Sequence, residues 1–329
     1  MDKLAFLFPG QGSQKVGMGS ELLAADPDIY DRYLTLADEV SGLPVRQLSL
    51  SGPMDDLTRT DVAQPALFAL ALAVEATARD IGLRPDFVAG HSLGEYTAAV
   101  ASGSLDATDG MRLVSERGRL MSEVQSVRPG AMAAIIGLTV EAVQDVCARA
   151  ADAGVVQLAN LNSPTQIVIS GEKAAVARAI EIAQGDGAQR ALPLPVGAAF
   201  HSALMKPVQE ELAKVMDGVE WRDAEIPLVA NHNGQAISSG ADIHEALVIQ
   251  IASPVRWVDC VRTLVDGGVR TFVEIGSGRV LSGLVKKIAP EALTFAADSR
   301  KKLSDFAGTR DRASRVMPVI RMDQLPPSA

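Results

Sequence analysis

Ser92 has the clearest chemical context in the chain. It stands in the string GHSLG at residues 90–94, after the short apolar run of residues 87–89 and before apolar positions spaced as on a helix. A serine between glycines at a strand-to-helix turn is typical of a nucleophile elbow, in which a sharp turn lifts the hydroxyl off the top of a sheet. A Cβ at either glycine would meet the neighbouring strand or helix. The helix start adds free N–H groups and a positive dipole end, so we expect a nucleophilic serine beside a place that stabilises an anion.

A serine nucleophile needs a base, and the chain offers four histidines. His91 is adjacent to the serine and should point elsewhere on an elbow, His232 lies in a predicted turn, and His244 lies in a predicted surface helix. His201 stands just before a helix predicted from about Ala203 to Met216. A single histidine is more often structural or exposed than catalytic, so position alone leaves the choice of base open.

A glycine-rich loop, GQGSQ at residues 10–14, follows the predicted buried strand Leu4–Phe8. It is not a Walker loop, because no Gly-Lys-Ser/Thr follows. One interpretation is a tight turn. The other is a backbone donor beside the elbow, since an oxyanion hole needs two N–H groups and Leu93, the residue after the nucleophile, supplies only one.

Arg117 lies within a helix predicted from Asp109 to about Val124. By composition alone, such an arginine is more often a solvated surface residue. A substrate with a free carboxylate, however, needs a planar two-pronged donor, and arginine is the side chain that provides one. The residues alone leave both interpretations open.

Several strings resemble one family. GHSLGEY at residues 90–96, preceded by GQGSQ, resembles the malonyl-CoA:acyl-carrier-protein transacylases and the acyltransferase domains of polyketide synthases. The resemblance covers about residues 3–298, with its motifs in the right order. It implies transfer of a malonyl group from malonyl-CoA to the thiol of an acyl carrier protein, through a malonyl-serine intermediate.

The resemblance also implies roles for the catalytic residues. It makes His201, in the string AFHS, the base. It makes the backbone carbonyl of Gln250 the group that holds this histidine, in place of the aspartate of a usual triad. It assigns the second oxyanion N–H to Gln11, with Leu93 as the first.

The substrate pocket implied by the resemblance contains further residues. Arg117, and not Arg119, fits the family's E-R-G-x-x-M setting at the malonyl carboxylate. Phe200 is aromatic where methylmalonyl-using relatives usually carry a smaller residue, which favours an unbranched malonyl group. Gln64, in a Gln-Pro pair, is expected near the site, although a helix-start role is as well supported. The other expected pocket residues are Met121, Asn160 and Asn162, the asparagines at the end of a predicted strand, where turn asparagines are also common.

The composition is that of an ordinary globular protein. The 329 residues are 47% hydrophobic and carry a net charge of −9, which provides for a sizeable core and argues against a nucleic-acid partner. No 18-residue apolar run and no charged leader with a long apolar stretch occur, so neither a membrane span nor a signal peptide is expected. We expect a cytoplasmic monomer with Cys147 and Cys260 as buried thiols and with neither a metal nor a cofactor.

The predicted elements give an α/β fold. The large domain, residues 1–128 and 198–299, is expected to be hydrolase-like, with a parallel sheet and helices on both faces. Residues 129–197 follow the order β-α-β-β-α-β of a ferredoxin-like unit, and we expect an inserted small domain there. A helix predicted from Gln64 to about Asp80 is hydrophobic on most sides and should be buried.

Residues 300–329 lie beyond the resemblance and are expected to form a C-terminal tail that is dispensable for chemistry. They are rich in charge and contain three prolines. The alternative is packing on the large domain through Val316, Val319 and Ile320.

Three functions are alternatives to a malonyltransferase of fatty-acid synthesis. A serine esterase or thioesterase would share the elbow and admit water, but an HGGG loop or an acidic triad partner would favour it, and the chain has GQGSQ and Arg117 instead. An inactive docking subunit would not need Ser92, His201 and Arg117 together. An acyltransferase that loads a polyketide synthase or the carrier of a malonate decarboxylase would use the same residues, and the sequence does not separate it.

Overall fold

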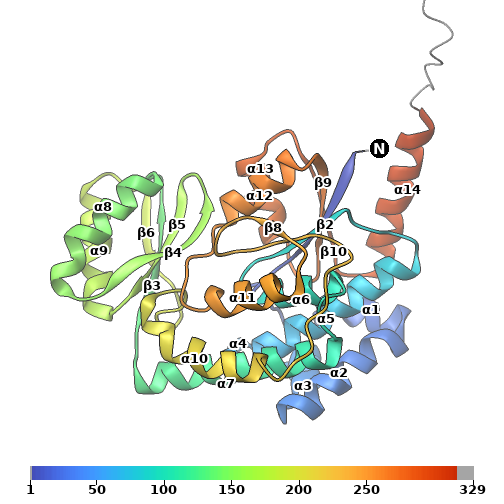
Figure 1. Cartoon of the computed structure of the whole chain (residues 1–329), viewed down its shortest axis with the longest axis horizontal. Coiled ribbons are helices and arrows are strands. Elements are labelled where there is room, and N and C mark those ends of the chain that lie inside the picture. The colour runs from blue at the N-terminus through green and yellow to red at the C-terminus, as the bar shows by residue number, and fades with distance from the viewer. Residues whose placement is uncertain (1, 317–329) are drawn as a thin grey trace, which may run out of the picture.

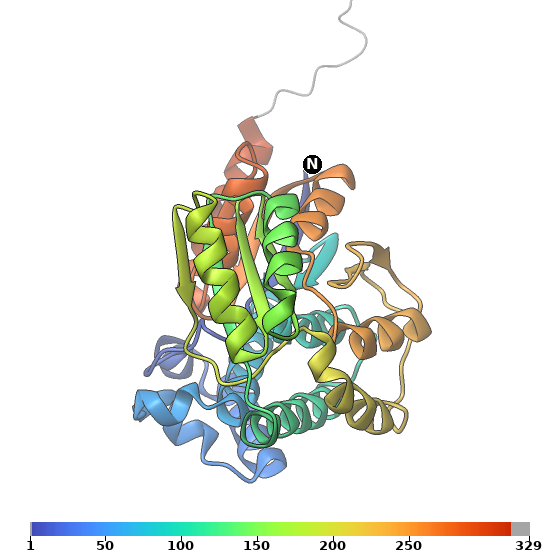
Figure 2. The same cartoon turned by 90° about the vertical axis from the view of Figure 1, so that its left-hand side faces the viewer.

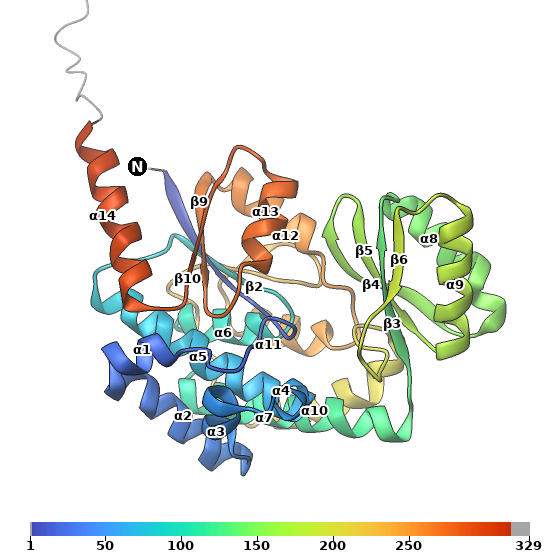
Figure 3. The same cartoon turned by 180° about the vertical axis from the view of Figure 1, so that it is seen from behind.

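The computed structural model describes residues 2–316. In this part of the chain the strands form two sheets, one of six strands and one of four. Figure 1 shows the smaller sheet at one end of the molecule and the C-terminal helix α14 (Arg300–Val316) at the other. Figure 3 shows the same arrangement from behind.

The large sheet has the order β10-β9-β1-β2-β7-β8. Its strands are β1 (Lys3–Phe8), β2 (Phe87–Gly90), β7 (Leu228–Val229), β8 (Ala236–Ile237), β9 (Val269–Ile275) and β10 (Leu293–Ala297). The pairs from β10 to β7 are parallel, and β8 runs antiparallel to β7. Phe8 lies opposite Gly90 in the β1–β2 pair, so the loops after these two strands leave the sheet side by side. This register places the glycine-rich loop at residues 10–14 next to the elbow.

Helices cover both faces of the large sheet. They are α1 (Ser20–Ala25), α2 (Pro27–Ser41), α3 (Val45–Ser51), α4 (Met54–Thr58), α5 (Thr60–Asp80), α6 (Leu93–Ala101), α7 (Ala107–Val127), α10 (Lys206–Met216), α11 (Gly240–Gln250), α12 (Trp257–Asp266) and α13 (Val280–Ile288), with a 3₁₀ turn at Ala203–Met205 before α10. Leu4, Phe6 and Phe8 of β1 belong to the core cluster formed with α2, α5, α6 and α7. Ala5 and Leu7 belong to the cluster formed with α12 and α13. Alternate residues of a strand point to opposite faces, so a strand covered on both sides is apolar throughout.

Helix α5 begins at Thr60, earlier than the predicted start at Gln64, and Pro65 lies inside it. A proline removes one backbone hydrogen bond, but the burial of nearly the whole helix outweighs that loss. The N–H of Ala63 closes the first turn on the carbonyl of Arg59 at 2.8 Å. Among the described helices, α5 has the length and hydropathy of a membrane span, and 89% of that stretch is buried inside the fold.

The small sheet is antiparallel, with the order β4-β5-β3-β6. Its elements are β3 (Ala131–Ile136), α8 (Val140–Ala150), the 3₁₀ turn Ala151–Ala153, β4 (Val156–Ser163), β5 (Gln166–Gly171), α9 (Lys173–Gly185) and β6 (Arg190–Pro193). The two helices cover one face of this sheet and face the viewer in Figure 2. This order and pairing are those of the predicted ferredoxin-like unit, and the two sheets together give the predicted α/β class.

Strand β4 extends further than predicted, to Ser163. Asn160 and Asn162 therefore lie within a strand, and not in a turn after it. Asn160 pairs with Val168 of β5 on one side and forms a parallel bridge with Val255 on the other. This backbone pairing on both sides overrides the preference of asparagine for turns.

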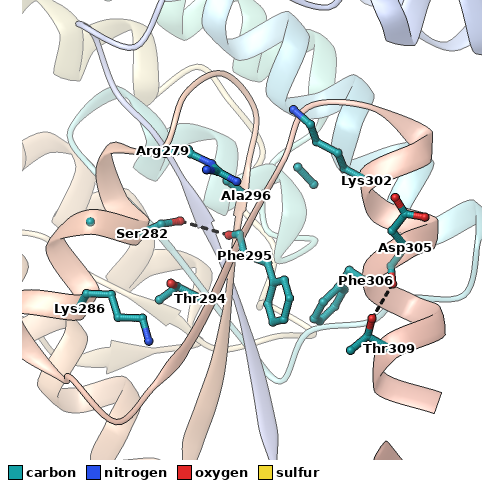
Figure 4. A pocket seen from close by; sticks show the side chains of 12 residues that line it. Arg279, Ser282, Lys286, Thr294, Phe295, Ala296, Lys302, Asp305, Phe306 and Thr309 are labelled. Carbon is teal, nitrogen blue, oxygen red and sulfur yellow. Dashed lines mark hydrogen bonds between the residues drawn. The ribbon is translucent and has the colours of Figure 1, made fainter. Parts of the chain in front are cut away.

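Helix α14 shows that the first part of the segment from residue 300 packs on the large domain, as the alternative to an exposed tail predicts. Leu303 and Phe306 are buried, and the ring centroid of Phe306 lies 4.7 Å from that of Phe295 in β10. The view in Figure 4 shows these two rings side by side at a cavity of about 560 Å³ between α13, β10 and α14. Arg300 also forms ion pairs with Asp26 and Asp80.

The alternative of packing on the large domain therefore holds for the first part of this segment, through residues that the prediction did not name. Val319 and Ile320 lie outside the described residues, as does the side chain of Val316. Strand β10, which α14 covers, was not predicted either.

Candidate active site

Ser92 lies at the turn between β2 and α6. Its φ and ψ are 54° and −107°, a backbone conformation that a residue with a Cβ rarely adopts. A Cβ on Gly90 would lie 1.9 Å from the carbonyl of Gly94, and a Cβ on Gly94 would lie 1.9 Å from the carbonyl oxygen of Phe8. The sharp turn therefore depends on the close packing of α6 against β1 and β2, which only glycine permits.

His201 is the histidine that meets the serine. Its Nε2 lies 2.7 Å from Ser92 Oγ, and its Nδ1 lies 3.1 Å from the backbone carbonyl oxygen of Gln250. A carbonyl only accepts hydrogen bonds, so Nδ1 carries the proton and Nε2 is left to accept one. Among residues 2–316, Ser92 and His201 are the two non-glycine residues with positive φ. Such backbone strain persists only where the surrounding contacts hold it.

The electrostatic environment keeps His201 neutral. The residue is 4% exposed. Burial, together with the nearby charge of Arg117, lowers the pKa of His201 to about 3. The imidazole is therefore unprotonated at neutral pH and is available as a general base.

Arg117 is 1% exposed, so it is not the surface arginine that composition alone favours. Its Nη2 donates to Ser92 Oγ at 2.9 Å and to Gln250 Oε1 at 3.1 Å. Its Nη1 donates to Gln64 Oε1 at 2.7 Å. All three acceptors are uncharged, and burial lowers the pKa of the guanidinium. Arg119, by contrast, pairs with two glutamates on the exposed side of α7.

The serine opens into a pocket of about 440 Å³. The pocket lies where the loop after β1, the elbow, α7 and the small sheet meet. With Ser92 and His201, its lining includes five of the predicted residues, which are Gln11, Arg117, Met121, Asn160 and Phe200.

The other four predicted residues are not part of the pocket lining; they are Gln64, Leu93, Asn162 and Gln250. Gln64 accepts from Arg117 and also contacts Met121, with Nε2 at 3.3 Å from Sδ. Asn162 does not line the pocket; its Oδ1 lies 2.8 Å from Nε2 of His91, which does. Leu93 is the first residue of α6, and Gln250 is the last residue of α11.

Two buried polar residues behind the elbow were missed from the sequence. Asn231 Oδ1 accepts the N–H of Ser92 at 2.8 Å, and its Nδ2 donates to the carbonyl of Gly90 at 2.7 Å. The carboxyl of Glu95 accepts the N–H of Asn231 at 3.1 Å and Nε2 of Gln250 at 2.6 Å. Asn231 lies in the string NHNG at residues 231–234, which is typical of a turn and does not indicate a role at the elbow. The only sequence signal for this pair is the position of Glu95, three residues after Ser92.

The chain is similar in sequence to proteins of one known family. The model of the family described as "Acyl transferase domain" matches residues 5–302. The malonyl CoA-acyl carrier protein transacylase of Bacillus subtilis is 44% identical over 318 residues, which cover 93% of this chain and 100% of that protein. The polyketide biosynthesis protein ThaF of Burkholderia thailandensis is 40% identical over 326 residues, which cover 99% of this chain and 28% of that protein.

Solved structures agree with these relatives. An acyl carrier protein S-malonyltransferase from Vibrio cholerae superposes with a TM-score of 0.88 at 42% identity, over 92% of this chain and 99% of that chain. A malonyl-transacylase in complex with a type II polyketide-synthase acyl-carrier protein gives a TM-score of 0.89 at 40% identity, over 93% of this chain and 99% of that chain.

Proposed function

The chain belongs to the family of acyl transferase domains, and from this premise we propose that it is a malonyl-CoA:acyl-carrier-protein S-malonyltransferase. A malonyl group moves from malonyl-CoA to Ser92 and then to the thiol of an acyl carrier protein. The names of its relatives, at 42–44% identity, support this reaction.

The first half of the reaction starts at His201. Its Nε2 accepts the proton of Ser92 Oγ while that oxygen attacks the thioester carbonyl of malonyl-CoA. The backbone N–H groups of Gln11 and Leu93 stabilise the oxyanion, and the positive end of α6 adds to their effect. The C–S bond then breaks, the proton passes from His201 to the sulfur of CoA, and a malonyl ester remains on Ser92.

The second half reverses these steps with another thiol. His201 accepts the proton of the carrier thiol as its sulfur attacks the ester carbonyl. The C–O bond of the ester breaks, the proton returns to Ser92 Oγ, and the malonyl thioester leaves on the carrier. Throughout, the carbonyl of Gln250 holds the imidazole in the tautomer that it needs.

The buried Arg117 beside Ser92 is the observation that favours malonyl over an uncharged acyl group. A fully buried guanidinium whose hydrogen-bond acceptors are all neutral is suited to an anionic acyl group. A carboxylate can take a bidentate pair from it, with Gln64 fixing the other edge of the guanidinium. Phe200 and Met121 line the same pocket, and the bulk of Phe200 favours an unbranched malonyl group.

Competition for the serine tests the proposal. The protein is incubated with equal amounts of malonyl-CoA, methylmalonyl-CoA and acetyl-CoA, and the intact protein is then weighed by mass spectrometry. We expect a malonyl adduct that maps to Ser92 and is absent from Ser92→Ala, because the ester needs the serine oxygen. A dominant acetyl adduct, or labelling retained in Ser92→Ala, would contradict it. Rapid loss of the adduct to water without a carrier would indicate a thioesterase.

The same reaction on a polyketide-synthase carrier is the second candidate. The likeness to ThaF and to a transacylase bound to a polyketide-synthase carrier protein favours it. Transfer rates to purified fatty-acid and polyketide carrier proteins, measured side by side, separate the two. For either carrier we propose a monomer that acts in the cytoplasm.

A further inference from the structure

We propose that Glu95 is a positioning residue of the acyl transfer, which holds Ser92 and His201 in place through Asn231 and Gln250. The inference rests on the proposed function, since it concerns the same serine and the same reaction. Glu95 lies in the first turn of α6, is fully buried and does not line the pocket. It therefore acts on the reacting atoms only through its neighbours.

The first branch runs through Asn231 to the elbow. One carboxyl oxygen of Glu95 accepts the backbone N–H of Asn231 at 3.1 Å. The side chain of Asn231 then bonds both sides of the elbow, the N–H of Ser92 at 2.8 Å and the carbonyl of Gly90 at 2.7 Å. These contacts hold the left-handed backbone of Ser92, which otherwise would relax.

The second branch runs through Gln250 to the base. The other carboxyl oxygen of Glu95 accepts Nε2 of Gln250 at 2.6 Å, and the same Nε2 donates to the carbonyl of Ser92 at 2.8 Å. With its side chain fixed in this way, Gln250 presents its own backbone carbonyl to His201 Nδ1 at 3.1 Å. One carboxyl thus connects the residue that carries the nucleophile with the residue that orients the base.

The chemistry of the two branches explains why a carboxyl stands here. Both oxygens of Glu95 face N–H donors, and an amide in its place would offer one acceptor and turn an N–H₂ group against the other donor. Burial raises the pKa of Glu95, and the hydrogen bonds that its oxygens accept from Gln250 and Asn231 oppose that rise, because they stabilise the carboxylate. An apolar residue would avoid the burial of a carboxyl group, but it would leave the N–H of Asn231 and one of the two N–H bonds of the Gln250 amide without partners.

Glu95→Gln is the direct test, and Glu274→Gln is its matched control. Glu274 is also fully buried, and its two oxygens accept the backbone N–H groups of Leu281 at 3.1 Å and Ser282 at 2.8 Å. Its partners belong to α13 and not to the elbow. Both substitutions therefore disturb two buried hydrogen bonds, but only one of them disturbs the reacting groups.

The measurement is the single-turnover rate of malonyl ester formation over a range of malonyl-CoA concentrations. For Glu95→Gln we expect the maximal rate to fall about ten- to hundredfold, because small displacements of reacting groups cost that much. The half-saturating concentration should change less than about threefold, since Glu95 does not touch the substrate pocket. Glu274→Gln should keep both values, although it unfolds at a lower urea concentration.

The outcomes separate cleanly. A folded Glu95→Gln protein that acylates at the unaltered rate overturns the inference, and so does an equal loss of rate in Glu274→Gln. If Glu95→Gln does not fold, Gln250→Met replaces it, because it removes the amide that Glu95 holds, together with the bonds of that amide to Arg117 and to the carbonyl of Ser92, and keeps the backbone carbonyl. An unaltered rate in that variant also overturns the inference. Failure of the unaltered protein to form the malonyl ester contradicts the proposed function itself.

Discussion

Ser92 Oγ lies between two groups with different electrostatic roles. His201 Nε2 at 2.7 Å is an acceptor for its proton, and Arg117 Nη2 at 2.9 Å donates to it. The positive charge of Arg117 opposes protonation of His201, which helps to lower the pKa of the imidazole. The base therefore stays free, and the same charge is available for a substrate carboxylate.

The pH dependence of acylation follows from this lowered pKa. An ordinary histidine, with a pKa near 6.5, would lose about tenfold of its base form for each pH unit below that value. Because the pKa of His201 is about 3, its base form persists on acidification, and we expect the acylation rate to change less than about twofold between pH 7 and pH 5. Stopped single-turnover labelling at a series of pH values measures this. A rate that halves near pH 6.5 and then falls tenfold per unit would show that His201 is solvated in the working enzyme.

At the scale of elements, the ends of β1 and β2 and the start of α6 pack in direct backbone contact. Strand β1 supplies the carbonyl of Phe8, β2 ends at Gly90, and α6 begins with Gly94 in its first turn. The helix start can approach the strands closely only because Gly94 has no side chain. The position of Ser92 is therefore set by backbone contacts.

Gly94→Ala tests this packing. The new Cβ would lie 1.9 Å from a backbone oxygen, so α6 must move, and we expect a loss of about 1–3 kcal/mol in the free energy of unfolding together with slow acylation. Gly283→Ala in α13 is the control, because its Cβ would have no atom within 4 Å and the helix should gain about 0.5–1 kcal/mol. Urea unfolding and malonyl labelling report the two effects. Normal acylation by Gly94→Ala would mean that the elbow does not depend on this contact.

At the scale of the whole molecule, the sequence predicts what is local and misses what arises from distant segments. The elbow is predicted because its strand, turn glycines and helix are contiguous. The contacts of Glu95 with Asn231 and Gln250 are not, because they join residues 136 and 155 positions apart. The place of Gln250 came from the resemblance, since any residue has a carbonyl.

The C-terminal segment gives a second case of this kind. Residues from 300 onward are rich in charge, which favours an exposed tail, but Leu303 and Phe306 fall one helical turn apart and bury one face of α14. The surface that they cover includes Phe295 of β10, an edge strand too short and partly exposed to stand out in the sequence. Neither the sequence of α14 nor that of β10 indicates by itself that these two elements pack together.

Phe306→Ala separates stability from chemistry at this scale. Removing a buried aromatic side chain costs about 3–5 kcal/mol in a core, so we expect a markedly lower melting temperature. The pocket at Ser92 lies at the carboxyl ends of β1 and β2, and none of its lining residues belongs to α14. The folded variant should therefore acylate at the normal rate. Ser304→Ala, an exposed change on the same helix, is the control and should alter neither value. An unchanged melting temperature would show that α14 does not pack as described.

Arg117 tests the account most directly, because the proposed function assigns the selection of the acyl group to its buried charge. Without it, the substrate carboxylate is buried unpaired at a cost of about 3–5 kcal/mol, so Arg117→Ala should lose malonyl transfer by about two to three orders of magnitude. Acetyl transfer should stay the same or rise, and Arg117→Lys should recover only part of the loss, because an ammonium lacks the planar fork. Arg119→Ala, on the exposed side of the same helix, is the control and should change neither rate.

The measurement is the ratio of kcat/KM for malonyl to that for acetyl transfer in each variant. A ratio that falls at least a hundredfold in Arg117→Ala and stays constant in Arg119→Ala is the predicted result. An equal fall for both acyl groups in Arg117→Ala would mean that Arg117 supports the fold or the serine alone, and a pocket that selects a carboxylate would be contradicted.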